Sequence, residues 1–280
     1  MRKARTVNMA ENLFYEHDKT AEIQSCEIMI ELQSRQAMKY VRPPINEAIC
    51  EIHFLLPFPL DQTQIERIQP VWQANYPYQQ MVAEQNVQLQ LSMDKVDAKS
   101  IPVGHKLIAR SADGKNLAQL GGTLVAINRL NPYLGWEESF KDTILARLAE
   151  AVNLYGFQDL DRVGLRYINK IDLPEKPVKW SDWFAVSLPV PEDFGERGGM
   201  FQFHFEQPMG GELHALINFL SLPTPLEKTT SVILDIDLVW HGFGKVSELA
   251  TTLEAVHAPH HNLFEAYLLD KTRNLFQIKH

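Results

Sequence analysis

The chain has 280 residues, of which 45% are hydrophobic and 10% aromatic, so it can bury a sizeable core and general disorder is excluded. Its 35 acidic and 27 basic side chains give a formal net charge of -8. That balance argues against a dedicated duplex-binding surface, because phosphate binding needs a positive field. The two cysteines, Cys26 and Cys50, form no CxxC motif, which is typical of a reducing compartment. With no apolar run near the roughly 18 residues of a spanning helix and no secretory signal, we expect a soluble, cytoplasmic protein.

Residues 1–37 contain no clear signals for the start or end of a helix or strand, and they predict at most a loose helix from about Glu11. Met38, followed by "KYVRPPINEA", looks like a natural start. We interpret 1–37 as an N-terminal extension outside the fold or as the product of an upstream translation start. The alternative is an arm that docks on a partner.

The segment from residue 46 to residue 56 predicts a strand with two different faces, because apolar and polar side chains alternate. One face carries Ala48, Cys50, Ile52 and Phe54, and the other carries Glu47, Glu51 and His53. After a proline-rich break, Asp61 predicts the N-cap of a short helix that ends before Pro77. Its apolar residues are Ile65, Ile68 and Trp72.

The rest of the first half, which we place at 38–156, predicts more strands and a long helix. Strict alternation indicates a strand over residues 87–93, and residues 105–120 read as a hairpin turning at Asp113-Gly114. Residues 122–130 give a further strand. An amphipathic helix follows over 136–155 and stops at Gly156.

The second half, 157–280, repeats this order. A strand over 161–173 leads into a proline-punctuated connector, 174–199, whose Trp180 and Trp183 either form a lid or pin the loop to the core. Alternating strands follow at 199–207, 211–220 and 230–241. Helices are expected at about 245–256 and, after Pro259, at about 260–276.

Each half therefore runs strand, connection, antiparallel strands and long amphipathic helix. This order predicts an α+β fold, with antiparallel sheet and amphipathic helices on one face. The two similar strand-rich halves either share a sheet or pair as two lobes.

Three segments resemble an uncharacterised family of bacterial proteins of about this length with a sporadic distribution. They are "PPINEAICEIHF" near the start, "VGLRYINKIDLP" in the middle and "HHNLFEAYLLDKTRNLF" near the end. The central strand motif is the most distinctive of the three, and the resemblance covers roughly residues 38–280. The family supplies no activity or catalytic residues, but its patchy distribution implies a link to mobile genetic elements or phage defence.

The face of the sheet opposite the helices is expected to gather carboxylates and imidazoles. The candidate site residues are Glu47, Glu51, His53, Arg166, His204, Glu206, His214, Asp235 and Asp237, with Lys170 and Glu212 beside them. Such groups are ordinary ligands of a divalent metal, which could activate water for phosphoester hydrolysis. The alternative is a solvated face whose ion pairs contribute roughly 0.2–1 kcal/mol each, and one-sided antiparallel sheets favour it.

Two smaller features each have two interpretations. Arg166 either grips a carboxylate or phosphate ligand in bidentate fashion or locks the sheet to an acidic neighbour. The histidines of "HAPHH", residues 257–261, are interpreted as part of a solvent-exposed turn between two helices, with a metal site as the alternative.

No nucleotide-binding, Rossmann, serine-hydrolase or zinc-protease motif occurs, so no catalytic residue is assigned. The leading hypothesis is a bacterial binding or regulatory protein that engages a basic protein partner or a second copy of itself. The alternative is a metal-dependent hydrolase or nuclease that uses the polar face. A third hypothesis is nucleic-acid binding through the basic residues around the first hairpin, which are Lys106, Arg110, Lys115 and Arg129.

Overall fold

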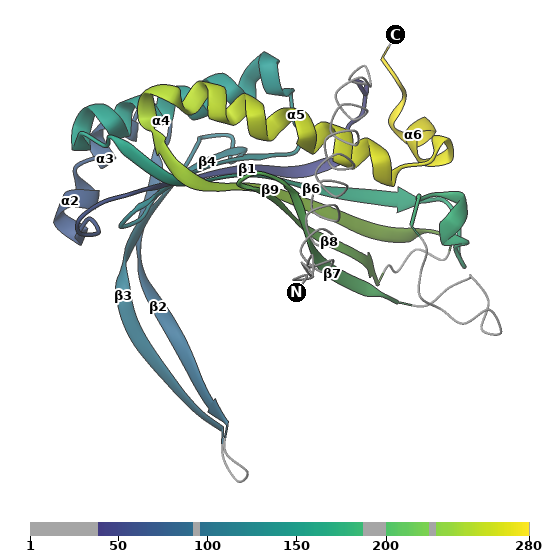
Figure 1. Cartoon of the computed structure of the whole chain (residues 1–280), viewed down its shortest axis with the longest axis horizontal. Coiled ribbons are helices and arrows are strands. Elements are labelled where there is room, and N and C mark those ends of the chain that lie inside the picture. Colours follow the sequence, from purple (N-terminus) through teal and green to yellow (C-terminus); the bar gives the residue numbers. More distant parts are fainter. Residues whose placement is uncertain (1–38, 92–95, 187–199, 224–227, 280) are drawn as a thin grey trace, which may run out of the picture.

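The computed structural model describes residues 39–91, 96–186, 200–223 and 228–279, and it describes the backbone alone for 86–91 and 96–103. The expected extension 1–37, Cys26 and the connector beyond residue 186 lie outside the described residues. Helices α4 (Lys141–Tyr155) and α5 (Leu249–Tyr267) lie along one face of a large antiparallel sheet (Figure 1). The predicted α+β class is confirmed.

The sheet has nine strands in the order β2-β3-β4-β5-β1-β6-β9-β8-β7. The strands of the first half are β1 (Ile45–Phe54), β2 (Tyr78–Leu91), β3 (Val96–Arg110), β4 (Asn116–Leu120) and β5 (Leu124–Leu130). Those of the second half are β6 (Asp159–Leu173), β7 (Gln202–Gly210), β8 (Leu213–Leu222) and β9 (Thr230–Lys245). The first strands of the two halves, β1 and β6, pair at the centre, and each half's last strand lies beside its first. The sequence left open whether the two halves share a sheet or pair as two lobes, and in the structure they share one sheet.

Short helices complete the helical layer. They are α2 (Gln62–Glu66), α3 (Gln69–Trp72), a π-helical turn η1 (Trp136–Phe140) that opens α4, the 3-10 turns η2 (Trp180–Asp182) and η4 (Val246–Glu248), and α6 (Asp270–Phe276). Among the described residues, no helix is both long and apolar enough to cross a membrane.

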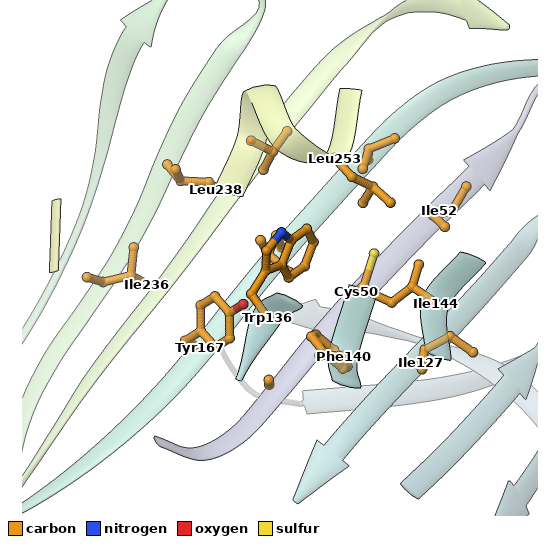
Figure 2. Packing of buried hydrophobic residues seen from close by; sticks show 14 of the residues in the cluster. Cys50, Ile52, Ile127, Trp136, Phe140, Ile144, Tyr167, Ile236, Leu238 and Leu253 are labelled. Carbon is orange, nitrogen blue, oxygen red and sulfur yellow. The ribbon is translucent and has the colours of Figure 1, made fainter. Parts of the chain in front are cut away.

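The core lies between the sheet and this helical layer. Alternation in β1 turns Ala48, Cys50, Ile52 and Phe54 toward the helices, and all four are buried. Figure 2 shows how side chains from the strands meet Trp136, Phe140 and Ile144 from the α4 region and Leu253 from α5. The apolar stripe of each helix thus covers the apolar face of the strands. The resulting burial of apolar surface is the main favourable contribution to the free energy of folding.

Several helices and turns begin or end where local sequence signals predict it. The carboxylate of Asp61 accepts from the backbone N–H of Gln64 at 2.8 Å, while the Gln64 side chain accepts from the backbone N–H of Asp61, which makes a capping box. Gly156 ends α4 with φ 70°, a conformation that glycine adopts without strain. The predicted hairpin turn is confirmed, since Ser111 and Asn116 pair across Asp113-Gly114.

The interpretation of "HAPHH" is wrong. Helix α5 continues through Pro259 and ends at Tyr267, instead of breaking there. Proline removes one helical hydrogen bond at a cost of about 3 kcal/mol, but buried residues on both sides of it hold the helix against the sheet. The ring of His257 stacks on Trp136 with centroids 4.2 Å apart, and Nε2 of His260 lies 2.9 Å from the carbonyl oxygen of Ile236. These histidines belong to the helix–sheet interface and not to an exposed turn.

Several strands are longer than expected. Residues 87–91 of the strand predicted at 87–93 form the outer part of β2, which begins at Tyr78, and the side-chain alternation predicted there lies outside the described residues. With β3 it forms a long two-stranded ribbon that extends away from the helical layer (Figure 1). Strand β9 runs on to Lys245, so α5 begins at Leu249 and not at residue 245.

The tryptophans of the connector pin it to the core, which was one of the two interpretations. Trp180 and Trp183 are both 3% exposed. Trp183 donates from Nε1 to Glu175 at 3.0 Å, and the ammonium of Lys271 lies 4.0 Å from the centre of its ring system.

Candidate functional site: the open face of the sheet

We call the face of the sheet opposite α4 and α5 the open face. The strand register places the polar residues of β1, β6, β9, β8 and β7 on it as cross-strand neighbours. Ile49 of β1 lies opposite Arg166, which lies opposite Asp237, and Ile168 lies opposite Asp235. Long side chains reach diagonal as well as directly opposite neighbours, so the register limits which charges can meet, and Arg166 bonds to the diagonal Asp235 and not to the opposite Asp237.

One group of interactions centres on Arg162 of β6. Its Nη1 lies 2.9 Å from the Glu51 carboxylate and 3.0 Å from Nε2 of His53. Its Nη2 lies 3.8 Å from the carboxylate of Asp237 on the other neighbouring strand. Arg162 therefore connects the polar side chains of β1 with those of β9.

A second group centres on Asp235 of β9. Arg166 binds it through two parallel hydrogen bonds of 2.7 and 2.6 Å, and Asn218 donates to it at 3.0 Å. The amide oxygen of Asn218 lies 2.7 Å from Nδ1 of His204 on β7. Asp235 is only 5% exposed whereas the Arg166 side chain is 40% exposed, so this charge-assisted contact is half-buried. Of the two interpretations of Arg166, the structure agrees with the second, in which Arg166 joins its strand to an acidic side chain of the neighbouring strand.

The central motif "GLRYIN" of β6 has a role at several positions. A Cβ at Gly164 would lie 3.4 Å from both the Arg162 guanidinium and the Asp237 carboxylate, so glycine leaves these two groups room above the strand. Tyr167 turns to the helices, where its hydroxyl contacts that of Tyr133 at 3.0 Å. Asn169 donates to the carbonyl of Leu234 on the next strand at 3.0 Å. The motif thus joins the open face to the core.

The remaining candidates lie apart from these two groups. Glu47 accepts from the amide of Asn128 at 2.7 Å, toward the β5 side of β1. Glu206 lies 3.4 Å from Nδ1 of His214, on the outer strands β7 and β8. Lys170 lies 3.6 Å from Asp172 on its own strand. The predicted residues do share one face, but they form two groups and several separate pairs along it and do not converge on one point.

Two carboxylates in the centre are shifted in opposite directions. His53 and Arg162 stabilise the charged form of Glu51 and lower its pKa to about 2. Burial raises the pKa of Asp237 to about 6, although the Arg162 and Arg166 guanidinium groups act in the opposite direction. Asp237 is thus held in a place that disfavours its own charge, a pattern that is common at functional sites.

We expect Asp237→Asn to stabilise the protein at neutral pH. Because folding raises the pKa of Asp237 from its ordinary 3.8 to about 6, the folded state holds this proton more tightly, and stability falls as pH rises from about 4 to 6. The neutral amide escapes that cost, so urea unfolding at pH 7.5 is expected to show a gain of about 1–2 kcal/mol, which vanishes near pH 4.

Asp235→Asn is the matched control, two residues away on the same strand. It removes the bidentate partner of Arg166, and we expect a loss of about 2 kcal/mol at pH 7.5. A loss of stability in Asp237→Asn as well would contradict the inferred cost of the Asp237 charge.

Several residues of this face were missed from the sequence. Arg162 lies four residues before Arg166 and so has the same strand parity, a signal that could have identified it. Asn218 and Asn128 were overlooked because an amide gives no charge signal. Gly164 could be explained only once the neighbouring strands were known.

Among the described residues the metal-site alternative finds no grouped ligands, and two of the basic residues proposed for nucleic-acid binding are already paired within the protein. Over the described parts of the chain, no group of three or more His, Cys, Asp or Glu side chains could hold a metal ion. Of the four basic residues around the first hairpin, Lys106 pairs with Glu84 at 3.3 Å, and Arg129 donates to Asn116 and to the carbonyl of Pro132.

A scan against models of known protein families and a search of curated proteins both returned no match for this chain.

Proposed function

We propose that this protein acts by binding, and that its open face docks a basic protein partner. The setting that the family resemblance implies, a mobile genetic element or a defence system, is part of this proposal. The observation that carries it is the distribution of the polar residues. Each carboxylate of the open face has a cation, amide or imidazole beside it, and the pairs are spread over several strands.

The charge of this face favours a basic partner. On strands β1, β6, β7, β8 and β9 its carboxylates outnumber its guanidinium and ammonium groups. The carboxylates of these strands are Glu47, Glu51, Asp172, Glu206, Asp235 and Asp237, and the cations are Arg162, Arg166 and Lys170. The acidic surplus agrees with the net charge of -8 and would steer a positively charged protein toward the face.

Apolar side chains lie between the ion pairs. Ile49, Ile168, Leu216 and Ile233 have the strand parity of the polar set and are only half-buried. A mixture of apolar side chains and matched charges is typical of a protein interface, whereas a hydrolytic site needs reactive groups that converge on one point.

Site-specific photocrosslinking in the native host tests this proposal. A photoreactive residue at Ile168 or Leu216 is expected to give one discrete product with a basic protein. The same residue at Ala149, exposed on the outer side of α4, is expected to give none and serves as the control. Equal yields from both faces, or an acidic protein as the product, would contradict the proposal.

Thermal melting with divalent cations separates binding from the hydrolase alternative. A ligand at one hundred times its dissociation constant adds about 2.7 kcal/mol to the stability of a native protein. We expect Mg²⁺, Mn²⁺ and Zn²⁺ to leave the melting temperature unchanged, and chelator likewise. A rise with one ion that is lost in the double variant Glu51→Ala/His204→Ala would favour the hydrolase instead.

A further inference from the structure

The outer edge of β7 has no partner strand in the described part of the sheet. Strand β7 pairs only with β8 and closes the sheet at one end. Gln202, His204 and Glu206 are exposed, and Phe205 is 38% exposed although it is a large apolar residue. Exposed strand edges of this kind are templates for another strand.

The ladder between β7 and β8 shows which backbone groups face outward. The N–H of Ser221 donates to the carbonyl of Phe201 at 3.0 Å, so Phe201 and Ser221 form a hydrogen-bonded pair. Because such pairs alternate along an antiparallel ladder, Phe203 and Phe205 also bond to β8. The N–H and C=O groups of Gln202, His204 and Glu206 therefore point away from the sheet.

We propose that a second copy of this chain docks on this edge, antiparallel to it, with the two-fold axis at Phe205. In that register His204 lies opposite Glu206 of the second copy. Both residues have outward backbone groups, so the pair exchanges two hydrogen bonds, and symmetry repeats the pair. The imidazole and the carboxylate of each pair lie on the same face, and the two Phe205 rings meet on the other.

Charge and geometry select this register over its neighbours. Outward residues must face outward residues, so the two-fold axis passes through a residue and not between two residues. An axis at Phe203 would place His204 opposite Gln202, and an axis at Gln207 would place Glu206 opposite Pro208, so neither pairs the imidazole with the carboxylate. An axis at Glu206 would place two carboxylates opposite each other, which is destabilising, and an axis at His204 would pair imidazole with imidazole. Pro208, which has no N–H, falls opposite Gln202, where its carbonyl still accepts.

The expected dimer is weak. Pairing along one short strand buries less than the 1,200–2,000 Å² of a standard interface, so we expect a dissociation constant on the order of 10 µM. The dimer does not depend on the partner proposed for the open face, because it needs the unpaired backbone edge of β7, although the side chains of His204 and Glu206 lie where this edge meets the open face.

Sedimentation velocity of the full chain from about 1 to 200 µM tests the dimer and its register. We expect a reversible shift from monomer to dimer. Glu206→Lys is expected to weaken it at least tenfold, and His204→Glu/Glu206→Lys is expected to restore it, because the exchanged charges again face each other. Both positions are exposed, and an unchanged melting temperature confirms that each variant folds.

A disulfide gives a second readout of the register. In a Cys26→Ser background, Phe205→Cys places two thiols at a non-hydrogen-bonded pair, about 4.5 Å apart between Cα atoms, which is within the range of a disulfide. Mild oxidation is expected to give a covalent dimer with this variant and none with Gln207→Cys, which lies opposite Phe203 in the proposed register.

Three results would overturn the proposal. They are a chain that stays monomeric at 200 µM, a dimer that Glu206→Lys leaves intact, and equal cross-linking of Gln207→Cys and Phe205→Cys. Failure of the photocrosslinking experiment on the open face would leave these results unaffected, so the two proposals fail separately.

Discussion

Acidification from pH 6.5 to 4.5 is expected to reduce the free energy of unfolding by several kcal/mol through the histidines of α5. Burial lowers the pKa of His257 to about 4 and that of His260 to about 3, against an ordinary value of 6.5. Both are therefore neutral in the folded state at pH values where the unfolded chain already binds the proton. Stability is lost as pH falls through this window, by about 2–3 kcal/mol for each histidine.

The comparison of wild type with His257→Gln/His260→Gln measures this effect by urea unfolding at several pH values. Glutamine at 260 can still donate to the carbonyl of Ile236 but does not titrate. We expect the wild type to have the larger free energy of unfolding at pH 7.5, because its imidazole rings pack against Trp136 and Tyr167. At pH 4.5 we expect the difference in free energy between the two proteins to be smaller by about 4–5 kcal/mol.

His241→Gln is the control for the loss of a histidine outside the helix–sheet interface, because His241 is exposed on β9. Asp237 acts in the opposite direction below pH 6, but it is present in both proteins and cancels in the comparison. A constant difference between wild type and double variant across the pH range would refute the assignment of these histidines as neutral groups.

Arg273→Leu is expected to cost about 3–4 kcal/mol, because it leaves a buried carboxylate without its cation. Glu265 is 4% exposed, and it accepts from Nε of Arg273 at 3.0 Å and from the Tyr40 hydroxyl at 2.7 Å. Nη2 of Arg273 also donates to the Glu265 carbonyl at 2.7 Å. Removal of one partner of a buried ion pair is far more costly than removal of both.

The double variant Glu265→Gln/Arg273→Leu provides the matched comparison, and we expect it to recover at least half of the loss in urea unfolding at pH 7.5. Tyr40→Phe removes only the neutral donor and is expected to cost about 1 kcal/mol. If Arg273→Leu cost less than Tyr40→Phe, the contact would be a surface pair of little energetic value.

This contact also ties the two ends of the described chain together. Val41 donates to the carbonyl of Gln277 at 2.7 Å, and Tyr40 packs edge-on against Phe276. The segment that enters β1 is thus held on α6, so loss of Arg273 is expected to loosen both ends of the fold.

The sequence alone predicted much of the secondary structure. Alternation in β1, β8 and β9 identified the buried residues of each strand, since successive side chains point to opposite faces. Asp61, Gly156 and Asp113-Gly114 marked element ends because their effects on the backbone are local. Alternation also placed the candidate residues on one face of the sheet.

Only the tertiary structure decided which of these residues meet. Helix α5 passes through Pro259 because packing on both sides of the proline outweighs a local preference, which no local signal can report. The pairing of Arg166 with Asp235, and of Arg162 with Glu51, depends on strand order and register between segments far apart in the sequence. The sequence by itself thus determined which side chains lie on each face of the sheet, because alternation is a property of a single strand. The tertiary structure decided which of those side chains form ion pairs and hydrogen bonds, because such contacts depend on the register between two strands.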